Sequence, residues 1–171
     1  RTPSSAGNRK TFTFSCWVKL TKPSSTLRLL SAGTASAQIS EIYYDSDKLR
    51  VFHYPGSSSI SLVTTQVFRD FSAWHSVVVA VDTSQSTASN RVRLYVNGSE
   101  VTDFSTSTYP SQNTDTFVNG ANAHYISAAT GNSNAPQSGY YGDGYLADVY
   151  LIDGSALDPT SFGAYDDNGV W

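Results

Sequence analysis

Several residue types that favour helices or covalent cross-links are scarce in this sequence of 171 residues. It contains no methionine, one cysteine and only two glutamates, Glu41 and Glu100. Because Glu and Met are strong helix formers, their scarcity argues against a helical protein. A single cysteine, Cys16, cannot form a disulfide within the chain, so nothing in the sequence indicates an oxidising compartment.

Charge and long apolar runs are also limited, which excludes two classes of partner. Eleven basic against fourteen acidic residues give a net charge of −3, and there is no basic cluster that could neutralise a phosphate backbone. We therefore expect no nucleic-acid partner. No apolar run approaches the roughly 20 residues that a membrane helix needs, and no signal peptide is recognisable, so we expect no membrane insertion. Because the chain starts at Arg1 without a methionine, we expect it to be part of a longer polypeptide.

Serine, threonine, tyrosine and valine are abundant instead, and this composition favours β-strands and turns. The clearest strand is predicted for residues 11–20, where apolar side chains alternate with polar ones. Cys16 alternates in phase with Phe14 and Val18, so we expect it to be a small buried hydrophobe. Residues 74–82 are the most apolar segment, which predicts a central strand covered on both faces.

Turn residues separate a series of further short strands. Residues 45–48 are predicted to form a hairpin turn, as are Asn97 and Gly98, which both tolerate a positive φ. Residues 158–163 predict a short helical turn, because Asp caps it and Pro takes its first position. Long polar loops are expected at residues 105–112 and 131–139. The remaining strands are predicted at residues 27–32, 39–44, 49–54, 60–67, 91–96, 100–104, 116–119, 124–128 and 144–153.

About ten short strands with turns between them predict an all-β fold, an antiparallel β-sandwich or jelly roll in which non-adjacent strands pair. There is no internal repeat and no linker, so a single domain is expected over residues 1–171. Within the last strand, alternation predicts one common face for Tyr145, Ala147, Val149 and Leu151.

Three segments resemble a known family: residues 1–19, residues 73–82 followed by 90–98, and residues 143–154 followed by 156–159. The characteristic pieces are Trp74-His75 before an apolar strand, then Arg93-Leu94-Tyr95-Val96-Asn97-Gly98, then Gly144-Tyr145-Leu146-Ala147-Asp148-Val149. Their order resembles the laminin-G-like branch of the concanavalin A-like lectin/glucanase superfamily. It is similar in particular to domains of phage tail fibres and other virion structural proteins, especially those of marine phages. The resemblance implies a concanavalin A-like/laminin-G-like sandwich on the surface of a phage particle, within a longer virion protein.

The resemblance does not extend to the catalytic residues of the glucanases, which carry a Glu-x-Asp-x-x-Glu strand motif. A retaining glycosidase needs two carboxyl groups about 5 to 5.5 Å apart. Glu41 and Glu100 lie in different segments, and neither has the required neighbours. The three histidines, His53, His75 and His124, accompany no Gly-x-Ser-x-Gly sequence and have no zinc-ligand spacing. His75 is expected to be a packed ring with satisfied nitrogens. We therefore expect no enzyme, and a glycoside hydrolase is the least favoured alternative.

Carbohydrate recognition needs flat aromatic faces and fixed polar groups, and the chain supplies 11 tyrosines together with long polar loops. Taken singly, each tyrosine is better explained as packing at the edge of the core. The hypothesis of a sugar site therefore depends on several such residues coming together. The candidate glycan-binding residues are Tyr43, Tyr54, Asn134, Tyr140, Tyr141 and Asp143.

The sequence thus predicts a non-catalytic fibre or receptor-binding module whose partner is a host-surface glycan. The alternative is a purely structural capsid-decoration or assembly domain that contacts other virion subunits and binds no small ligand. A homotrimer formed through the parent protein fits either role. No cofactor and no metal site are predicted. Calcium stays open, because relatives often hold it near their binding loops and it needs six to eight oxygen ligands.

Overall fold

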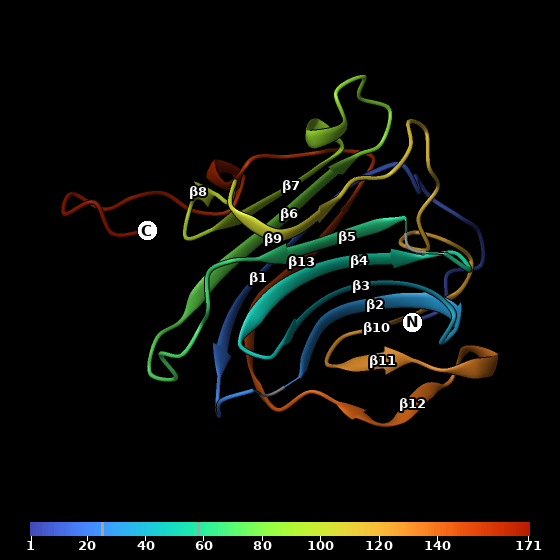
Figure 1. The fold of residues 1–171 in the computed structure, drawn as a ribbon, viewed down its shortest axis with the longest axis horizontal. Coiled ribbons are helices and arrows are strands. Elements are labelled where there is room, and N and C mark those ends of the chain that lie inside the picture. The colour runs from blue at the N-terminus through green and yellow to red at the C-terminus, as the bar shows by residue number, and fades with distance from the viewer. Residues whose placement is uncertain (25, 58) are drawn as a thin grey trace.

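Two antiparallel sheets pack face to face in the computed structural model, which describes residues 1–24, 26–57 and 59–171 (Figure 1). Sheet A consists, in spatial order, of β13 (Gly144–Asp153), β1 (Thr11–Leu20), β6 (His75–Asp82), β7 (Val92–Val96) and β8 (Ser99–Glu100). Sheet B consists of β10 (Ala123–Tyr125), β2 (Leu27–Ala35), β3 (Gln38–Asp45), β4 (Lys48–Tyr54), β5 (Ile60–Thr64) and β9 (Phe104–Thr108). A small third sheet pairs β11 (Ala128–Thr130) with β12 (Pro136–Tyr141).

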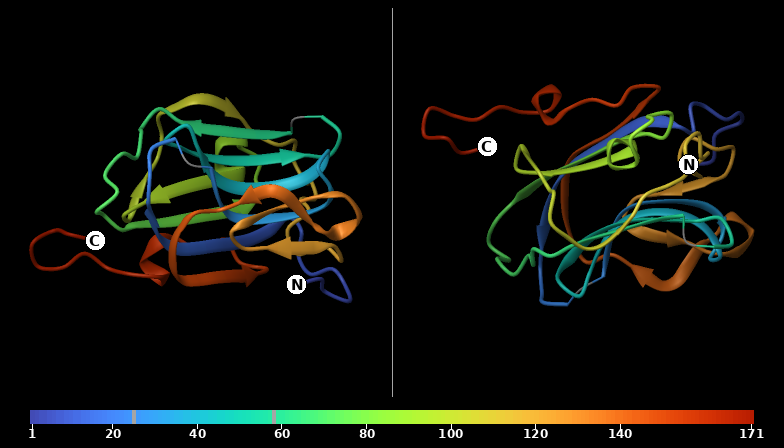
Figure 2. Two further views of the ribbon diagram at one scale, coloured as in Figure 1. Left: turned by 90° about the horizontal axis from the view of Figure 1, so that it is seen from below. Right: turned by 45° about the horizontal axis from the view of Figure 1, so that its top comes forward.

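Three short 3-10 helices complete the described chain: η1 (Ala88–Arg91), η2 (Asn132–Asn134) and η3 (Pro159–Ser161). None of the helices in this part of the chain has the length and apolar character needed to cross a membrane. The side chain of Asp158 accepts a hydrogen bond from the Thr160 backbone N–H and so caps η3, as the sequence predicts. Beyond η3 the chain ends in a segment that leaves the sandwich (Figure 2).

The core lies between the two sheets, and the alternation seen in the sequence accounts for it. β1 has the predicted bounds, and Phe14, Cys16 and Val18 on its inner face are at most 1% exposed. Burial raises the pKa of the Cys16 thiol to about 12, so this side chain stays protonated and acts as a small hydrophobe. The fold class predicted from the sequence is confirmed, including the pairing of strands that are distant in the chain.

β6 is the middle strand of sheet A and is buried on both faces, as its continuous apolar sequence predicts. Its inner residues join the core between the sheets. On the outer face, Val78 and Ala80 pack with Tyr95 of β7, and Phe162 from the C-terminal segment packs against this cluster. The residues between β13 and Phe162 therefore form a partial third layer over sheet A, before the chain turns away from the sandwich (Figure 2).

The two predicted hairpin turns are confirmed by their backbone angles. Ser46 and Asp47 have φ values of 54° and 64° between β3 and β4, and Asn97 and Gly98 have values of 48° and 77° between β7 and β8. Two successive positive φ values characterise the type I′ turn, whose twist matches that of the strands it joins.

The sequence prediction is wrong where the chain leaves sheet A after Glu100. The predicted return strand at residues 100–104 shrinks to the two residues of β8, because the chain then crosses to sheet B. There β9 pairs with β5, so the predicted loop at residues 105–112 begins inside a strand. Four of the five residues of β9 are exposed, which means that backbone hydrogen bonds rather than burial hold it in place.

Four other predicted elements differ from the structure. A turn replaces the strand predicted at 116–119, and the strand predicted at 60–67 ends at Thr64. The strand predicted at 124–128 is divided between β10 and β11, and β12 begins inside the loop predicted at 131–139. Positive φ angles explain two of these differences, 59° at Asn119 and 61° at Ser127. A residue in the left-handed region interrupts the extended backbone of a regular strand.

A β-bulge in β13 changes which of its side chains face the core. The register between β1 and β13 shifts beside Asp148, whose φ is 47°. Leu151 pairs with Phe14 of the core face, whereas Tyr145 pairs with Lys19 of the outer face. The single common face predicted from the sequence is therefore wrong: Tyr145 and Ala147 point outward, while Val149 and Leu151 point inward.

Candidate functional site

The outer face of sheet B carries a row of aromatic and arginine side chains. In β3 and β4, residues such as Tyr44 and Val51 point into the core, so their neighbours along each strand point outward. These outward residues share one face of sheet B, and the β11–β12 hairpin lies beside β2, the strand next to β3 (Figure 1). Together with one residue each from β2 and β12, they form what we name the aromatic face: Arg28, Tyr43, Arg50, Phe52, Tyr54 and Tyr140.

Arg28 holds two tyrosine rings of the aromatic face together. Its guanidinium carbon lies 5.4 Å from the centre of the Tyr43 ring and 4.9 Å from that of the Tyr140 ring, within the range of cation–π contacts. Its Nε donates a hydrogen bond of 3.2 Å to Oε1 of Glu41, and both residues are buried. Burial raises the pKa of Glu41, while the charge of Arg28 and its hydrogen bond act in the opposite direction. Because a lone buried charge is costly, the pair fixes Arg28 and the rings it contacts.

Polar groups flank these rings and reach solvent. Nη2 of Arg50 lies 2.9 Å from Oδ2 of Asp45, both side chains are partly exposed, and the guanidinium carbon lies 6.0 Å from the centre of the Tyr43 ring. The buried Nε of Arg50 has no hydrogen-bond partner among the described residues. On the same face, the rings of Phe52 and Tyr54 stack with centres 5.9 Å apart and planes 11° apart. The face thus combines flat apolar rings with fixed N–H donors.

Three of the six candidate residues from the sequence share the aromatic face. Tyr43 and Tyr140 contact the same guanidinium, and Tyr54 lies on the same side of sheet B. Tyr141 follows Tyr140 in β12, so it points to the opposite side of that strand, where it is 62% exposed.

The other two candidates, Asn134 and Asp143, form hydrogen bonds or ion pairs with neighbouring residues of the chain. Asn134 has a φ of 58°, its carbonyl accepts a hydrogen bond from the Tyr125 hydroxyl, and its side chain accepts one from the Ala123 backbone. Oδ2 of Asp143 lies 3.0 Å from Nζ of Lys22, and this contact lowers the pKa of Asp143. The structure does not bring either residue to the aromatic face.

Sequence reasoning missed the residues that organise this face. Arg50 and Phe52 alternate with Leu49 and Val51, so the period of two already places them on the outer face beside Tyr54. No comparable signal exists for Arg28, because its partner Glu41 is thirteen residues away and the two meet only through the pairing of β2 with β3.

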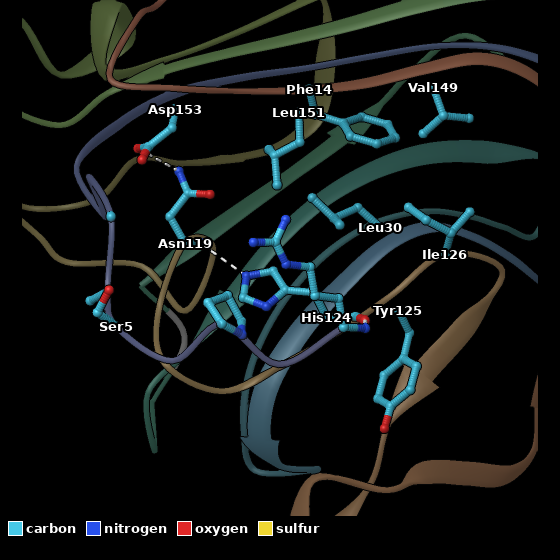
Figure 3. A pocket seen from close by; sticks show the side chains of 14 residues that line it. Ser5, Phe14, Leu30, Asn119, His124, Tyr125, Ile126, Val149, Leu151 and Asp153 are labelled. Atoms are coloured by element: carbon cyan, nitrogen blue, oxygen red, sulfur yellow. Dashed lines mark hydrogen bonds between the residues drawn. The ribbon is translucent and has the colours of Figure 1, made fainter.

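A cleft of about 820 Å³ opens at one side of the sandwich, where β13 and β10 are the edge strands of the two sheets (Figure 3). The N-terminal residues 1–7 and the turn around Asn119 line it as well. We name it the edge cleft, and none of the six candidate residues lines it.

The described residues offer no group of three or more His, Cys, Asp or Glu side chains placed to hold a metal ion. The two glutamates lie in different sheets, Glu41 in β3 and Glu100 in β8. His75 packs against Phe68, with ring centres 5.3 Å apart, but its buried Nε2 lacks a hydrogen-bond partner in the described part of the chain. The expectation that both ring nitrogens of His75 are satisfied is wrong.

Comparisons with known proteins agree with this fold. The family model of the concanavalin A-like lectin/glucanases superfamily matches residues 1–160. A search of curated proteins gives no significant match. A heptameric SAP-like pentraxin from Limulus polyphemus is similar at 16% identity and a TM-score of 0.64, over 94% of this chain and 71% of that chain.

Two further solved structures are similar over most of this chain. One is the CBM40 of the Ruminococcus gnavus IT-sialidase bound to α2,3-sialyllactose, with 14% identity, a TM-score of 0.57 and coverage of 90% of this chain and 81% of that chain. The other is a Trypanosoma rangeli sialidase, with 16% identity, a TM-score of 0.52 and coverage of 88% of this chain but 21% of that chain. At these identities the likeness shows a shared fold alone.

Proposed function

Because the chain belongs to the concanavalin A-like lectin/glucanase superfamily, we propose that it is a carbohydrate-binding module and that the aromatic face of sheet B is its sugar site. The observation that carries the proposal is the position of the Arg28 guanidinium between the rings of Tyr43 and Tyr140. Two rings held by a buried ion pair are preorganised, so a ligand loses little entropy in ordering them.

A pyranose ring has an apolar side, made of its C–H groups, that stacks on aromatic rings, and a hydroxylated rim that needs donors and acceptors. The half-exposed ring of Tyr140 and the stacked pair of Phe52 and Tyr54 would take the apolar sides of successive sugar units. Arg50 and Asp45 would bind hydroxyl groups or, through the arginine, an acidic sugar. A sialyllactose is the ligand named for the similar CBM40 structure, which is in line with this class of ligand.

The proposed module is non-catalytic. Hydrolysis with retention or inversion uses a pair of carboxyl groups on either side of the scissile bond. On the aromatic face, Glu41 is buried against Arg28 and Asp45 is paired with Arg50, so both carboxylates have structural partners.

A glycan array with wild-type protein and two neighbouring substitutions tests the sugar site. Tyr140→Ala should reduce binding to the strongest array glycan by about tenfold, because loss of an aromatic contact costs about 1.5 kcal/mol. Tyr141→Ala is the matched control, since it removes a similarly exposed ring from the other side of β12, and it should bind like the wild type. A chain that binds no glycan, or equal losses in both variants, would contradict the proposal.

The wider role that we propose rests on the sequence resemblance: a fibre or receptor-binding module of a phage virion, whose partner is a host-surface glycan and whose parent protein forms a homotrimer. A purely structural assembly domain is the second candidate. It is favoured by aromatic side chains that are exposed on or next to sheet A, with exposed fractions of 42% for Trp74, 59% for Tyr145 and 48% for Tyr150. Light scattering separates the two, because an assembly domain would self-associate and Tyr145→Ala would weaken that association.

A further inference from the structure

The edge cleft exists because the two sheets have edges of unequal length on the same side of the sandwich. β13 has ten residues, whereas the facing edge strand β10 has three. The inward side chains of Val149 and Leu151 therefore extend beyond the cover of sheet B, and each is 38% exposed. Ile126, in the connection after β10, is 46% exposed on the opposite wall. In Figure 3 these side chains line one part of the cleft together with Leu30.

The other end of the cleft is polar, and its groups are held in fixed orientations. Nδ2 of Asn119 donates to the Asn8 carbonyl and to Oδ1 of Asp153, both at 3.0 Å. The backbone N–H of Asn119 donates to Nε2 of His124 at 2.9 Å, and Nδ1 of that ring lies 2.8 Å from the Asn122 carbonyl. His124 is therefore a neutral ring that donates through Nδ1 and accepts through Nε2. In Figure 3, Asn119 and Asp153 lie together at the end of the cleft away from Ile126.

Two oxygen acceptors at this end remain available to a ligand. Within the described residues, neither Oδ1 of Asn119 nor Oδ2 of Asp153 accepts a hydrogen bond. The other polar atom of each side chain, Nδ2 of Asn119 and Oδ1 of Asp153, already takes part in two hydrogen bonds. Gly7 passes close to the same carboxylate, because a Cβ at this position would lie only 2.2 Å from Oδ2 of Asp153. Only a residue without a side chain can pass so close to this carboxylate, so Gly7 lets the N-terminal segment pack against this end of the cleft.

We propose that the edge cleft is a second binding site, separate from the aromatic face, for an amphiphile with a hydroxylated head and an apolar tail. The exposed side chains of Ile126, Val149 and Leu151, with the buried Leu30 beneath them, take the tail, whose burial supplies the main favourable term. The free oxygens of Asn119 and Asp153 accept hydrogen bonds from hydroxyl groups of the head. Arg1 also lines the cleft and carries a positive charge, but a carboxylate head placed next to the two acceptors meets the negative charge of Asp153, which repels it. The volume of about 820 Å³ is within the range of about 300–1,000 Å³ that is typical of small-ligand sites.

Titration with octyl β-D-glucoside, below its micelle concentration, tests this proposal on the 171-residue chain. Calorimetry should give saturable binding of one molecule per chain. Methyl β-D-glucoside, which lacks the tail, and octanoate, which replaces the hydroxylated head with a carboxylate, should each bind at least tenfold more weakly. Absence of saturable binding would overturn the proposal, as would equal affinity for either of the two simpler compounds.

Substitutions on opposite sides of β13 locate the site. Leu151→Asp should weaken octyl glucoside binding at least tenfold, and so should Ile126→Ser on the facing wall. Tyr145→Ala, on the outer side of the same strand, and Tyr43→Ala, on the aromatic face, should leave it unchanged. The last variant separates the two proposals, because the edge cleft can bind whether or not the aromatic face takes a glycan.

Backbone amide shifts of the wild-type protein provide a measurement that does not depend on any variant folding. Octyl glucoside should shift the amide signals of Leu30, Asn119, Ile126 and Leu151. Shifts confined to β3, β4 and β12 would place the amphiphile on the aromatic face and overturn the assignment.

Discussion

His53 is a buried titratable residue in the middle of the core. Its Nδ1 lies 2.9 Å from the Ser40 hydroxyl, its ring packs against Phe117, and its Nε2 has no partner among the described residues. Burial, and next the positive charge of Arg9, lower the pKa of His53 from 6.5 to about 4. The folded state therefore strongly prefers the neutral ring.

This shift makes the stability of the protein depend on pH. The unfolded chain takes up a proton on His53 as the pH falls below 6.5, whereas the folded chain does so only near 4. The contribution of neutral His53 to the free energy of unfolding is therefore complete above pH 6.5. It is lost as the pH falls towards 4, and the loss is about 3 kcal/mol at most. Denaturant unfolding at several pH values should show this decline, and His53→Leu should make it shallower. An equally steep decline in the variant would contradict the assignment to His53.

At the scale of single elements, the bulge in β13 explains both an error of sequence reasoning and the shape of the edge cleft. Asp148 has a positive φ, but the sequence does not mark it as unusual. It is a polar residue at a position where the alternation of the strand already predicts a polar residue. The bulge turns Val149 and Leu151 inward, so a local backbone feature decides which side chains line the cleft.

Substitution at the bulge tests this account. Asp148→Gly should leave the free energy of unfolding unchanged or raise it by up to about 1 kcal/mol, because glycine adopts a positive φ without steric cost. Asp148→Val should lower it by more than about 1 kcal/mol, because a β-branched side chain is strained there. Thermal unfolding of the two variants measures the difference, and equal effects would mean that the bulge is absent.

One buried serine of β2 makes hydrogen bonds that help to dock the β11–β12 hairpin on sheet B. The Ser31 hydroxyl accepts a hydrogen bond from the Thr130 backbone N–H at 2.8 Å and lies 3.0 Å from the Thr130 hydroxyl, in a buried site. Ser31→Ala leaves these groups without a partner and should cost about 1–3 kcal/mol. Amide hydrogen exchange at Thr130 should become faster. Thr34→Ala, an exposed change on the same strand, is the control and should have no effect on that exchange rate.

Strands with local signals were predictable, and those that depend on distant partners were not. β1 and β13 have the predicted bounds because their alternation is complete in the sequence. β9 and β12 are polar and have no such pattern, and they exist because β5 and β11 offer them hydrogen-bond partners. The same limit applies to the candidate site, where Tyr43 and Tyr54 follow from alternation but the ion pair beneath them does not.

At the scale of the whole molecule, the sandwich gives two separate surfaces with different chemistry. The aromatic face is an outer surface with paired charges and stacked rings, as expected for sugars. The edge cleft is an opening into the layer between the sheets, with an aliphatic wall and a polar end. The overall architecture follows from the period of two in the sequence, whereas both surfaces depend on how the sheets and the hairpin are placed relative to one another.

The central claim is that the aromatic face binds a glycan, and amide shift mapping tests it most directly. The protein labelled with nitrogen-15 is titrated with the glycan that gives the strongest array signal. We predict that the largest shifts fall on Arg28, Tyr43, Arg50, Tyr54 and Tyr140, on the outer side of β2, β3, β4 and β12. Shifts gathered instead on the outer face of sheet A, around Tyr145 and Tyr150, would contradict the claim.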